Sequence, residues 1–398
     1  MILRGEAVKK LFAFVLSFVL SFALLVGFAV PIEAAQPVVR SDVAGHQLGE
    51  VIDLIMTRYV GEPLTVDELL EAAMRGMTDI LDQYSIYLSA SELARFTNSM
   101  DGRLRGIGVS MSVMRDGRIM VARVLPDSPA LRAGIQLGDV LLYVDGLDIE
   151  GMPLDFVTAL ITNPAYERVV VTFERDGQNI SFDILKEEIR SPTVIVERLE
   201  NEPEAEGFRG LRHFRYMQIS SVSQTTGADV RRALSQMQEE GVRGIILDLR
   251  GNTGGHLDVT VDIGNQMIPE GTILQTVNQS GRVRTYNSHL TEMPFDNIVV
   301  LVNRFTASAA EVLASALQDS GAAIIVGETT FGKGLVQTVY MTQNGGALKL
   351  TTEEFYRRNG EAINGIGVVP CVLVDRRTNF DEPDMVLRRG IELLIEGR

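Results

Sequence analysis

Residues 209–374 alternate between strand-like and helix-like segments, and this alternation restricts the fold more than any other feature of the sequence. Apolar runs typical of strands occupy 243–250, 297–303, 322–327, 335–341 and 347–356. Helical patterns follow the first two runs, at 256–268 and from Ser308 onward. This alternation predicts an α/β core whose central strands are largely parallel. Reactive groups on such a sheet are expected where its strands end in loops.

The segment before this core, residues 104–188, has a different pattern. Its predicted strands are short and separated by turn residues, at 106–113, 118–125, 140–146 and 168–177. A short helix is predicted at 128–135. Strands of this length with only short helices predict a small, compact β module inserted ahead of the core.

Residues 46–96 have a helical pattern. Apolar side chains recur at spacings near 3.6 residues, at Leu48, Val51, Ile52, Ile55 and Met56. Thr65 and Glu68 fit a capping box at the start of the next helix. We expect this N-terminal segment to serve packing or self-association, for example in a homodimer, and not catalysis.

The first 35 residues are typical of an export signal. Three basic residues precede an uncharged apolar run at 11–30, and Ala34 and Ala35 are candidate cleavage positions. The run is also long enough to span a bilayer, so cleaved secretion and a membrane anchor through residues 11–30 are both open. Either alternative places the remaining chain outside the cytoplasm, because the basic residues stay on the cytoplasmic side.

The charge of the chain excludes one class of partner. The formal net charge is −15, whereas nucleic-acid phosphates require a basic surface. Cys371 is the only cysteine, so no intrachain disulfide can form, and no Cys/His signature surrounds it. The sequence implies no metal and no cofactor.

Ser308 admits two interpretations. With Glu311 it fits the S-x-x-E capping box, and the helix behind it has a clean apolar face. A serine at such a position is usually a helix cap. It can also be a nucleophile, provided that a base lies beside it.

Lys333 lies between Gly332 and Gly334, which allow a sharp turn and a close approach to other chain segments. Residues 327–334 match the P-loop pattern G-x-x-x-x-G-K, but Gly334 stands where the magnesium-binding hydroxyl belongs. A P-loop also opens a helix, whereas the alternation of 335–341 predicts a strand. Nucleotide binding is therefore rejected.

A neutral lysine can act as the base for a serine, and burial lowers a lysine pKa toward the neutral range. If a strand begins at Lys333, its period of two places Gln337 on the same face, where its carbonyl can orient the amine. The N–H of Ala309 would be one oxyanion donor at the helix start. The second would come from the loop 251–255, with Gly254 preferred to Gly255.

Several segments together resemble a known family. They are "LDQYSIYLSASE", "LDLRGNTGG", "NRFTASAAEVLASALQD", "VGETTFGKGLVQ" and "GIGVVPCVLV". The joint pattern is similar to the C-terminal processing peptidases, or tail-specific proteases, over about residues 46–395. "GIGVSM" and "VLPDSPALRAGIQLGDVLLYVDG" resemble a PDZ domain.

The resemblance implies an exported Ser–Lys endopeptidase of the bacterial cell envelope, with Ser308 as nucleophile, Lys333 as general base and Gln337 as its orienting partner. It implies Ala309 and Gly254 as oxyanion donors. The PDZ domain would bind C-terminal tails of polypeptide substrates through backbone amides. The residues of that loop are Gly106, Ile107, Gly108 and Val109.

These considerations predict four parts. Residues 1–35 form the signal or anchor, 36–97 a helical segment, 98–190 the PDZ domain, and 191–398 the α/β protease core, with part of the N-terminal segment. The sequence departs from the family at Thr162 and Asn163, where many relatives have an Arg-Gly pair that helps to couple the PDZ domain to the core. Cys371 stands where an aspartate is usual.

Two alternatives stay open at this point. The chain can be a PDZ-bearing scaffold whose protease core is latent or inactive. It can also be a Ser–His–Asp hydrolase that uses His213 or His256 as its base.

Overall fold

The computed structural model describes residues 41–101, 103–114, 117–163, 165–190, 192–374 and 384–397. The apolar run 11–30 and the candidate cleavage positions lie outside these residues. Within the described part, no helix is long and apolar enough to cross a bilayer. Contacts divide the chain into two units, Met1–Ala72 and Ala73–Arg398.

The N-terminal segment is largely helical, as predicted. Its helices are α2 (Ser41–Arg58), α3 (Val66–Asp79) and α4 (Ala90–Met100). The predicted capping box is present, because the Glu68 carboxylate accepts a hydrogen bond from the Thr65 N–H at 2.7 Å. The prediction of helix throughout 46–96 is wrong at β1 (Ile86–Leu88). β1 is a strand because it pairs with a strand of the core, a contact that local periodicity does not reveal.

A six-stranded sheet forms the centre of the core. In spatial order its strands are β10 (Val194–Arg198), β11 (Phe214–Ile219), β12 (Gly244–Asp248), β15 (Asn297–Val302), β16 (Ile324–Gly327) and β19 (Val372–Leu373). β10 is antiparallel to β11, and all other neighbours are parallel. The predicted largely parallel α/β core is therefore confirmed.

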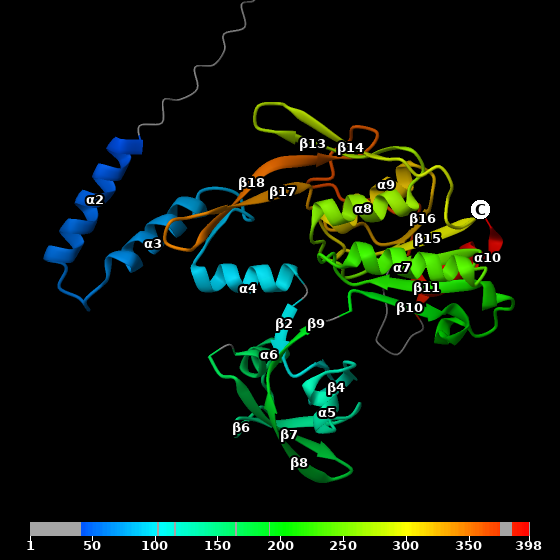
Figure 1. The fold of residues 1–398 in the computed structure, drawn as a ribbon, viewed down its shortest axis with the longest axis horizontal. Helices are drawn as coiled ribbons and strands as arrows, with labels where there is room; N and C mark the ends of the chain where they lie inside the picture. The colour runs from blue at the N-terminus through cyan, green and yellow to red at the C-terminus, as the bar shows by residue number, and fades with distance from the viewer. Residues whose placement is uncertain are drawn as a thin grey trace, which may run out of the picture. The chain divides into compact units, whose positions relative to one another are not determined.

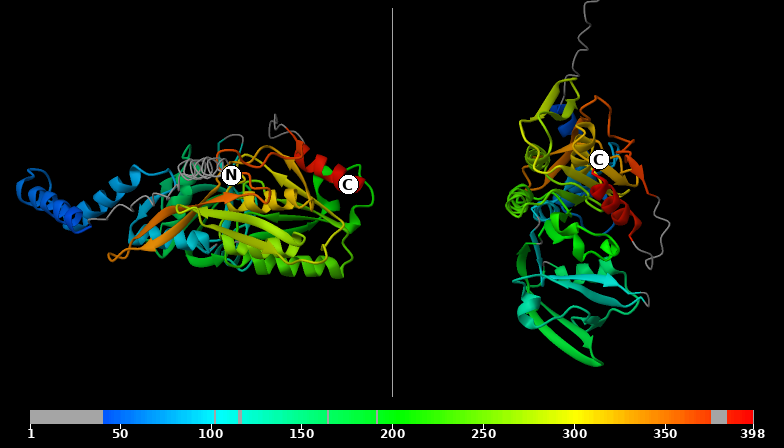
Figure 2. Two further views of the ribbon diagram at one scale, coloured as in Figure 1. Left: turned by 90° about the horizontal axis from the view of Figure 1, so that it is seen from above. Right: turned by 90° about the vertical axis from the view of Figure 1, so that its right-hand side faces the viewer.

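Helices cover both faces of this sheet. On one face α7 (Thr226–Glu239), α8 (Leu257–Met267) and α9 (Ala309–Asp319) lie side by side (Figure 1). α10 (Met385–Glu396) packs on the opposite face, away from those three helices (Figure 2). Strand β12 shows why both faces are covered. Its Ile245 and Leu247 belong to one apolar cluster, and Ile246 belongs to the other.

A second, antiparallel sheet packs on the far side of α8 and α9. Its strands are β1, β13 (Gly271–Asn278), β14 (Val283–Ser288), β17 (Leu335–Met341) and β18 (Ala347–Tyr356). The sequence predicts β17 and β18 as strands, but it does not predict that they leave the parallel sheet. β18 is long enough to pair with β1 at one end, with β13 at the other, and with β17 along its second edge.

The β module has a core of its own. It contains β3 (Val109–Val113), β4 (Ile119–Val124), β5 (Val140–Val144), β6 (Leu147–Asp148), β7 (Arg168–Arg175), β8 (Gln178–Leu185), α5 (Pro129–Ala133) and α6 (Leu154–Thr162). The ladder of β2 (Arg103–Gly106) and β9 (Glu187–Arg190) joins its two ends. The module is thus an insertion ahead of the core, as predicted.

Candidate active site

Ser308 precedes the first residue of α9 and has an unusual backbone conformation. Its φ and ψ are 56° and −123°. Among the described residues, the other non-glycine residues with positive φ are three aspartates, a residue type that tolerates positive φ comparatively well. A strained non-glycine residue of this kind is common at functional sites, where surrounding contacts hold it in place.

Glu311 supplies those contacts. Its side chain is fully buried, and its carboxylate accepts the Ser308 N–H at 2.8 Å. It also accepts the Thr330 hydroxyl at 2.5 Å and the N–H groups of Gly332 and Lys333 at 2.7 and 2.8 Å. One carboxylate therefore joins the backbone of the helix start to the backbone of the lysine loop. The sequence predicted the helix-cap contact and missed the other three.

We expect Glu311→Gln to lower kcat by roughly 10²-fold, because small displacements of reacting groups have effects of this size. The amide would direct an NH₂ group at N–H donors, and the free energy of unfolding should fall by about 1–3 kcal/mol. Turnover in the peptidase assay that the sequence resemblance suggests, and urea unfolding, measure the two effects. Glu328→Gln, a partly exposed position in the same loop, is the control. An unchanged kcat in folded Glu311→Gln would contradict this role.

Lys333 lies in the loop before β17, and its side chain is half-buried. The close approach that the flanking glycines suggested is present, since a Cβ on Gly334 would lie 2.2 Å from the Asn364 nitrogen. Burial lowers the pKa of Lys333, and the nearby Lys349 cation lowers it further. Asp82 and Glu311 act in the opposite direction. The net effect is a pKa below the ordinary lysine value.

The amine of Lys333 lies over the ring of Tyr84, 4.7 Å from its centroid. Among the described residues, no hydrogen bond joins this amine to the hydroxyl of Ser308 or to the side chain of Gln337. β17 begins at Leu335, two residues later than the sequence argument assumed. The Gln337 amide donates to Leu335 O at 3.3 Å and to the Thr351 hydroxyl at 3.4 Å.

The residues predicted to be catalytic lie around one cavity of about 360 Å³. Ser308, Ala309, Lys333 and Gln337 all line it. Part of its wall comes from the end of α4 and the residue after it, through Phe96, Thr97, Met100 and Asp101. The sequence predicted packing or self-association for residues 46–96, and it did not predict that the end of this segment would line the cavity. Periodicity identified α4 as a helix but could not indicate what its apolar side covers.

The candidate backbone donors beside Ser308 come from the start of α9 and from the loop after β12. Ala309 is the first residue of α9, where N–H groups have no acceptor within the helix. The Gly254 N–H is donated to the Asn252 side chain at 2.8 Å. Gly255 lines the cavity. The Asn252 carbonyl accepts the Ala307 N–H at 2.9 Å, which fixes this loop against the start of α9.

His256 also lines the cavity, whereas His213 does not. The Nε2 atom of His256 is buried without a hydrogen-bond partner among the described residues. Its nearest carboxylate oxygen, Oδ1 of Asp101, is 3.8 Å away. This distance is too long for the hydrogen bond that orients a triad histidine.

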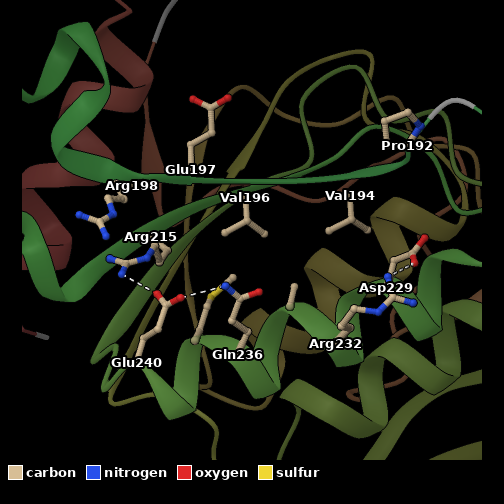
Figure 3. A pocket seen from close by; sticks show the side chains of 12 residues that line it. Pro192, Val194, Val196, Glu197, Arg198, Arg215, Asp229, Arg232, Gln236 and Glu240 are labelled. Carbon is tan, nitrogen blue, oxygen red and sulfur yellow. Dashed lines mark hydrogen bonds and ion pairs between the residues drawn. The ribbon is translucent and has the colours of Figure 1, made fainter. Parts of the chain in front are cut away.

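A larger cavity of about 610 Å³ lies between β10 and α7 (Figure 3). Its arginines are paired with acidic side chains, since Arg215 contacts Glu240 at 2.7 Å and Arg232 contacts Asp229 at 3.1 Å. No serine, threonine or cysteine lines it. Volume alone therefore does not identify the reactive site in this chain. In the described part of the chain, no cluster of His, Cys, Asp or Glu side chains could hold a metal ion.

The predicted tail-binding loop connects β2 and β3. Gly108 has a φ of 86°, and a Cβ there would lie 2.2 Å from the Cβ of Ser128, so only glycine fits. Gly106 ends β2, Ile107 is buried, and Val109 begins β3. This loop leads directly into an open strand, the arrangement that strand addition of a peptide requires.

Thr162 and Asn163, which depart from the family pattern, make hydrogen bonds within the β module. The Thr162 hydroxyl donates to Thr158 O at 2.8 Å, and Asn163 O accepts the Lys186 amine at 2.6 Å. Cys371 is exposed.

Comparisons with known proteins match both the core and the inserted β module. A model of "Peptidase family S41" matches residues 213–374, and a "PDZ domain" model matches residues 97–173. The chain is 30% identical to the carboxy-terminal-processing protease of Bartonella bacilliformis, over 83% of this chain and 75% of that one. It is 30% identical to the carboxyl-terminal-processing protease of a Synechocystis species, over 86% and 81% of the two chains.

A solved structure is similar over most of its length. The photosystem II D1 C-terminal processing protease aligns with a TM-score of 0.52 and 29% identity, covering 85% of this chain and 89% of that one. A putative S41 protease from Bacteroides fragilis aligns with a TM-score of 0.56 at 16% identity, which bears on the fold alone.

Proposed function

Because this chain belongs to the carboxyl-terminal-processing serine proteases of peptidase family S41, we propose that it cleaves polypeptides outside the cytoplasm with Ser308 as nucleophile and Lys333 as general base. One observation carries the assignment of these residues. The two side chains line the same cavity, and their backbones are hydrogen-bonded to the same buried carboxylate of Glu311.

The reaction would proceed in two halves. The Ser308 hydroxyl attacks the scissile carbonyl carbon while the neutral Lys333 amine takes its proton, and that proton then passes to the leaving amine. A water molecule, deprotonated by Lys333, attacks the resulting ester, and the proton returns to Ser308 as the new carboxyl end departs. Lys333 must first turn from Tyr84 toward Ser308, and Gln337 would orient the amine in that position.

Backbone N–H groups would stabilise the tetrahedral intermediate. Ala309 supplies the first donor at the positive end of α9. Gly254 remains a candidate for the second, but its N–H is already donated to Asn252. Gly255 lines the cavity, and we therefore place it ahead of Gly254.

The PDZ domain would select the substrates. The amides of the loop from Gly106 to Val109 would bind a C-terminal carboxylate, and the peptide would add as a strand beside β3. Since relatives carry names of carboxy-terminal processing proteases, we propose polypeptides with free C-terminal tails as the substrate class. The apolar run 11–30 would export the chain to the cell envelope, as a cleaved signal or as an anchor.

The N-terminal helices would support a homodimer. α2 exposes Val43, Val51 and Leu54 on one side of the helix, an apolar set that a second copy of the helix would cover. Sedimentation of the chain with and without residues 41–58 tests this part of the proposal. A monomer at all protein concentrations would contradict it.

Labelling with a fluorophosphonate tests the nucleophile directly. We expect the reagent to modify the peptide that contains Ser308 in the wild-type chain. Ser308→Ala should stay unlabelled, and Ser315→Ala, in the same helix, should be labelled normally. A latent scaffold would give no label in any of the three. Labelling that persists in Ser308→Ala would refute the assignment.

The histidine alternative has a separate test. If Lys333 is the base, His256→Ala should keep most of the labelling rate and Lys333→Met should lose it. The reverse result would favour a histidine base.

A further inference from the structure

A second lysine lies in the reactive cavity, and the mechanism above does not use it. Lys349 is on β18, lines the same cavity as Ser308 and Lys333, and is half-buried. Its amine lies over the ring of Phe96, 5.4 Å from the centroid. An aromatic ring holds each of the two amines, and both rings come from the segment between α3 and the end of α4.

The strand pairing places Lys349 on the side of the reactive groups. In the antiparallel pair of β17 and β18, Val339 lies opposite Lys349 and Gln337 lies opposite Thr351. Residues directly opposite each other, and residues two apart on one strand, point to the same face. Lys349 therefore shares a face with Gln337, the residue proposed to orient Lys333.

The charged groups near the two amines act differently on Lys333 and on Lys349. The other titratable groups near them are Asp82 and Tyr84 in the turn before β1, Asp101 after α4, His256 at the start of α8, and Glu311 in α9. Burial lowers the pKa of both lysines and Asp82 opposes this effect, while the Lys349 cation lowers the pKa of Lys333 further. Among the charged groups that act on Lys333, Lys349 is the one that opposes the carboxylates of Asp82 and Glu311.

We propose that Lys349 is a positioning residue of the protease, a second cation whose repulsion favours the uncharged form of the Lys333 amine that a general base needs. The proposal rests on the assignment of Lys333 as base. Two positive charges in one partly dehydrated cavity repel each other, so one amine loses its proton at a lower pH than the other. Both residues line the cavity and the Lys349 cation acts on Lys333, so Lys333 is that amine.

The test is the pH dependence of kcat/KM on an unstructured peptide. Lys349→Met should move the acid limb of the profile to higher pH and lower the rate at pH 7 on the order of tenfold. The plateau at high pH and KM should be retained. Lys349→Arg, which keeps the charge, should restore the wild-type limb. Arg282→Met removes one exposed positive charge from the turn between β13 and β14, outside the cavity, and should leave the profile unchanged.

A second measurement does not depend on activity. Lysine amines labelled by ¹³C reductive methylation can be titrated by NMR, with the Lys333 signal identified by its loss in Lys333→Met. Its midpoint should rise in Lys349→Met and in Lys349→Gln. A Lys333 midpoint and an acid limb that match wild type in a folded neutral variant would overturn the proposal, as would Lys349→Arg behaving like Lys349→Met. Full activity of Lys333→Met would instead overturn the assignment of the base itself.

Discussion

Ser308→Ala and Lys333→Met should each lower kcat by about 10⁴-fold or more, and the double variant should be no slower than the slower single variant. Nucleophile and base act as one unit, so removing either removes nearly the whole contribution of both. The measurement is turnover of an unfolded protein substrate by all four chains at equal concentration. Additive losses in the double variant would show that the two side chains contribute independently, contrary to the proposal.

Lys333→Met should be inactive although its fold is as stable as wild type or more so. Because burial and the Lys349 cation lower the pKa of Lys333, the unfolded chain binds a proton more readily than the folded chain does. The contribution of Lys333 to the free energy of unfolding therefore rises with pH, from its lowered pKa up to its ordinary value near 10.4. Urea unfolding across this range should show a steeper rise for wild type than for Lys333→Met. Identical pH slopes would mean that the amine is not perturbed by the fold.

Gly255→Ala should lower kcat by roughly 10²–10³-fold, which is the usual loss when an oxyanion donor is displaced. Its φ is 149°, and a Cβ there would lie 1.9 Å from the carbonyl oxygen of Val222, so the loop must move. Gly254→Ala would place a Cβ 2.9 Å from the Ala309 nitrogen, and its loss should be similar.

Gly251→Ala is the matched control for this loop. Its φ is also positive, at 73°, but no neighbouring atom lies within 4 Å of an added Cβ. We therefore expect a small loss of stability from backbone strain and near-normal kcat. Peptide kinetics and thermal unfolding on the three variants separate the two effects. Equal kcat in Gly251→Ala and Gly255→Ala would contradict an oxyanion role for the loop.

The sequence predicts well those parts of the fold that local patterns determine. β12, β15 and β16 are apolar runs between turn signals, and their alternation with helices specifies a parallel sheet. The sequence does not reveal that β17 and β18 join a separate antiparallel sheet, because membership of that sheet depends on pairing with β1 and β13. A three-residue strand carries too little periodicity to be recognised by itself.

In the candidate site too, the sequence indicated the residues that stand beside local features and missed those that only the tertiary fold brings together. Ser308, Lys333 and Gln337 stand beside unusual local features, such as a helix start and a glycine pair, and each lines the cavity. Glu311 looked like an ordinary helix cap, since its contacts to the lysine loop cross 21 and 22 residues of sequence. Tyr84 and Lys349 had no local signal at all, because only the tertiary fold brings them together with Lys333.

The docking of the turn before β1 on β18 affects when the enzyme can first act. Asp82 accepts the Thr351 hydroxyl at 3.1 Å across 269 residues, and Thr351 N–H donates to the Ser85 hydroxyl at 3.0 Å. A ribosome adds residues from the N-terminus, so a nascent chain that ends before β18 lacks both Lys349 and the strand that receives this turn. The surroundings that this turn provides for Lys333, through Asp82 and Tyr84, can therefore assemble only after most of the chain has been synthesised.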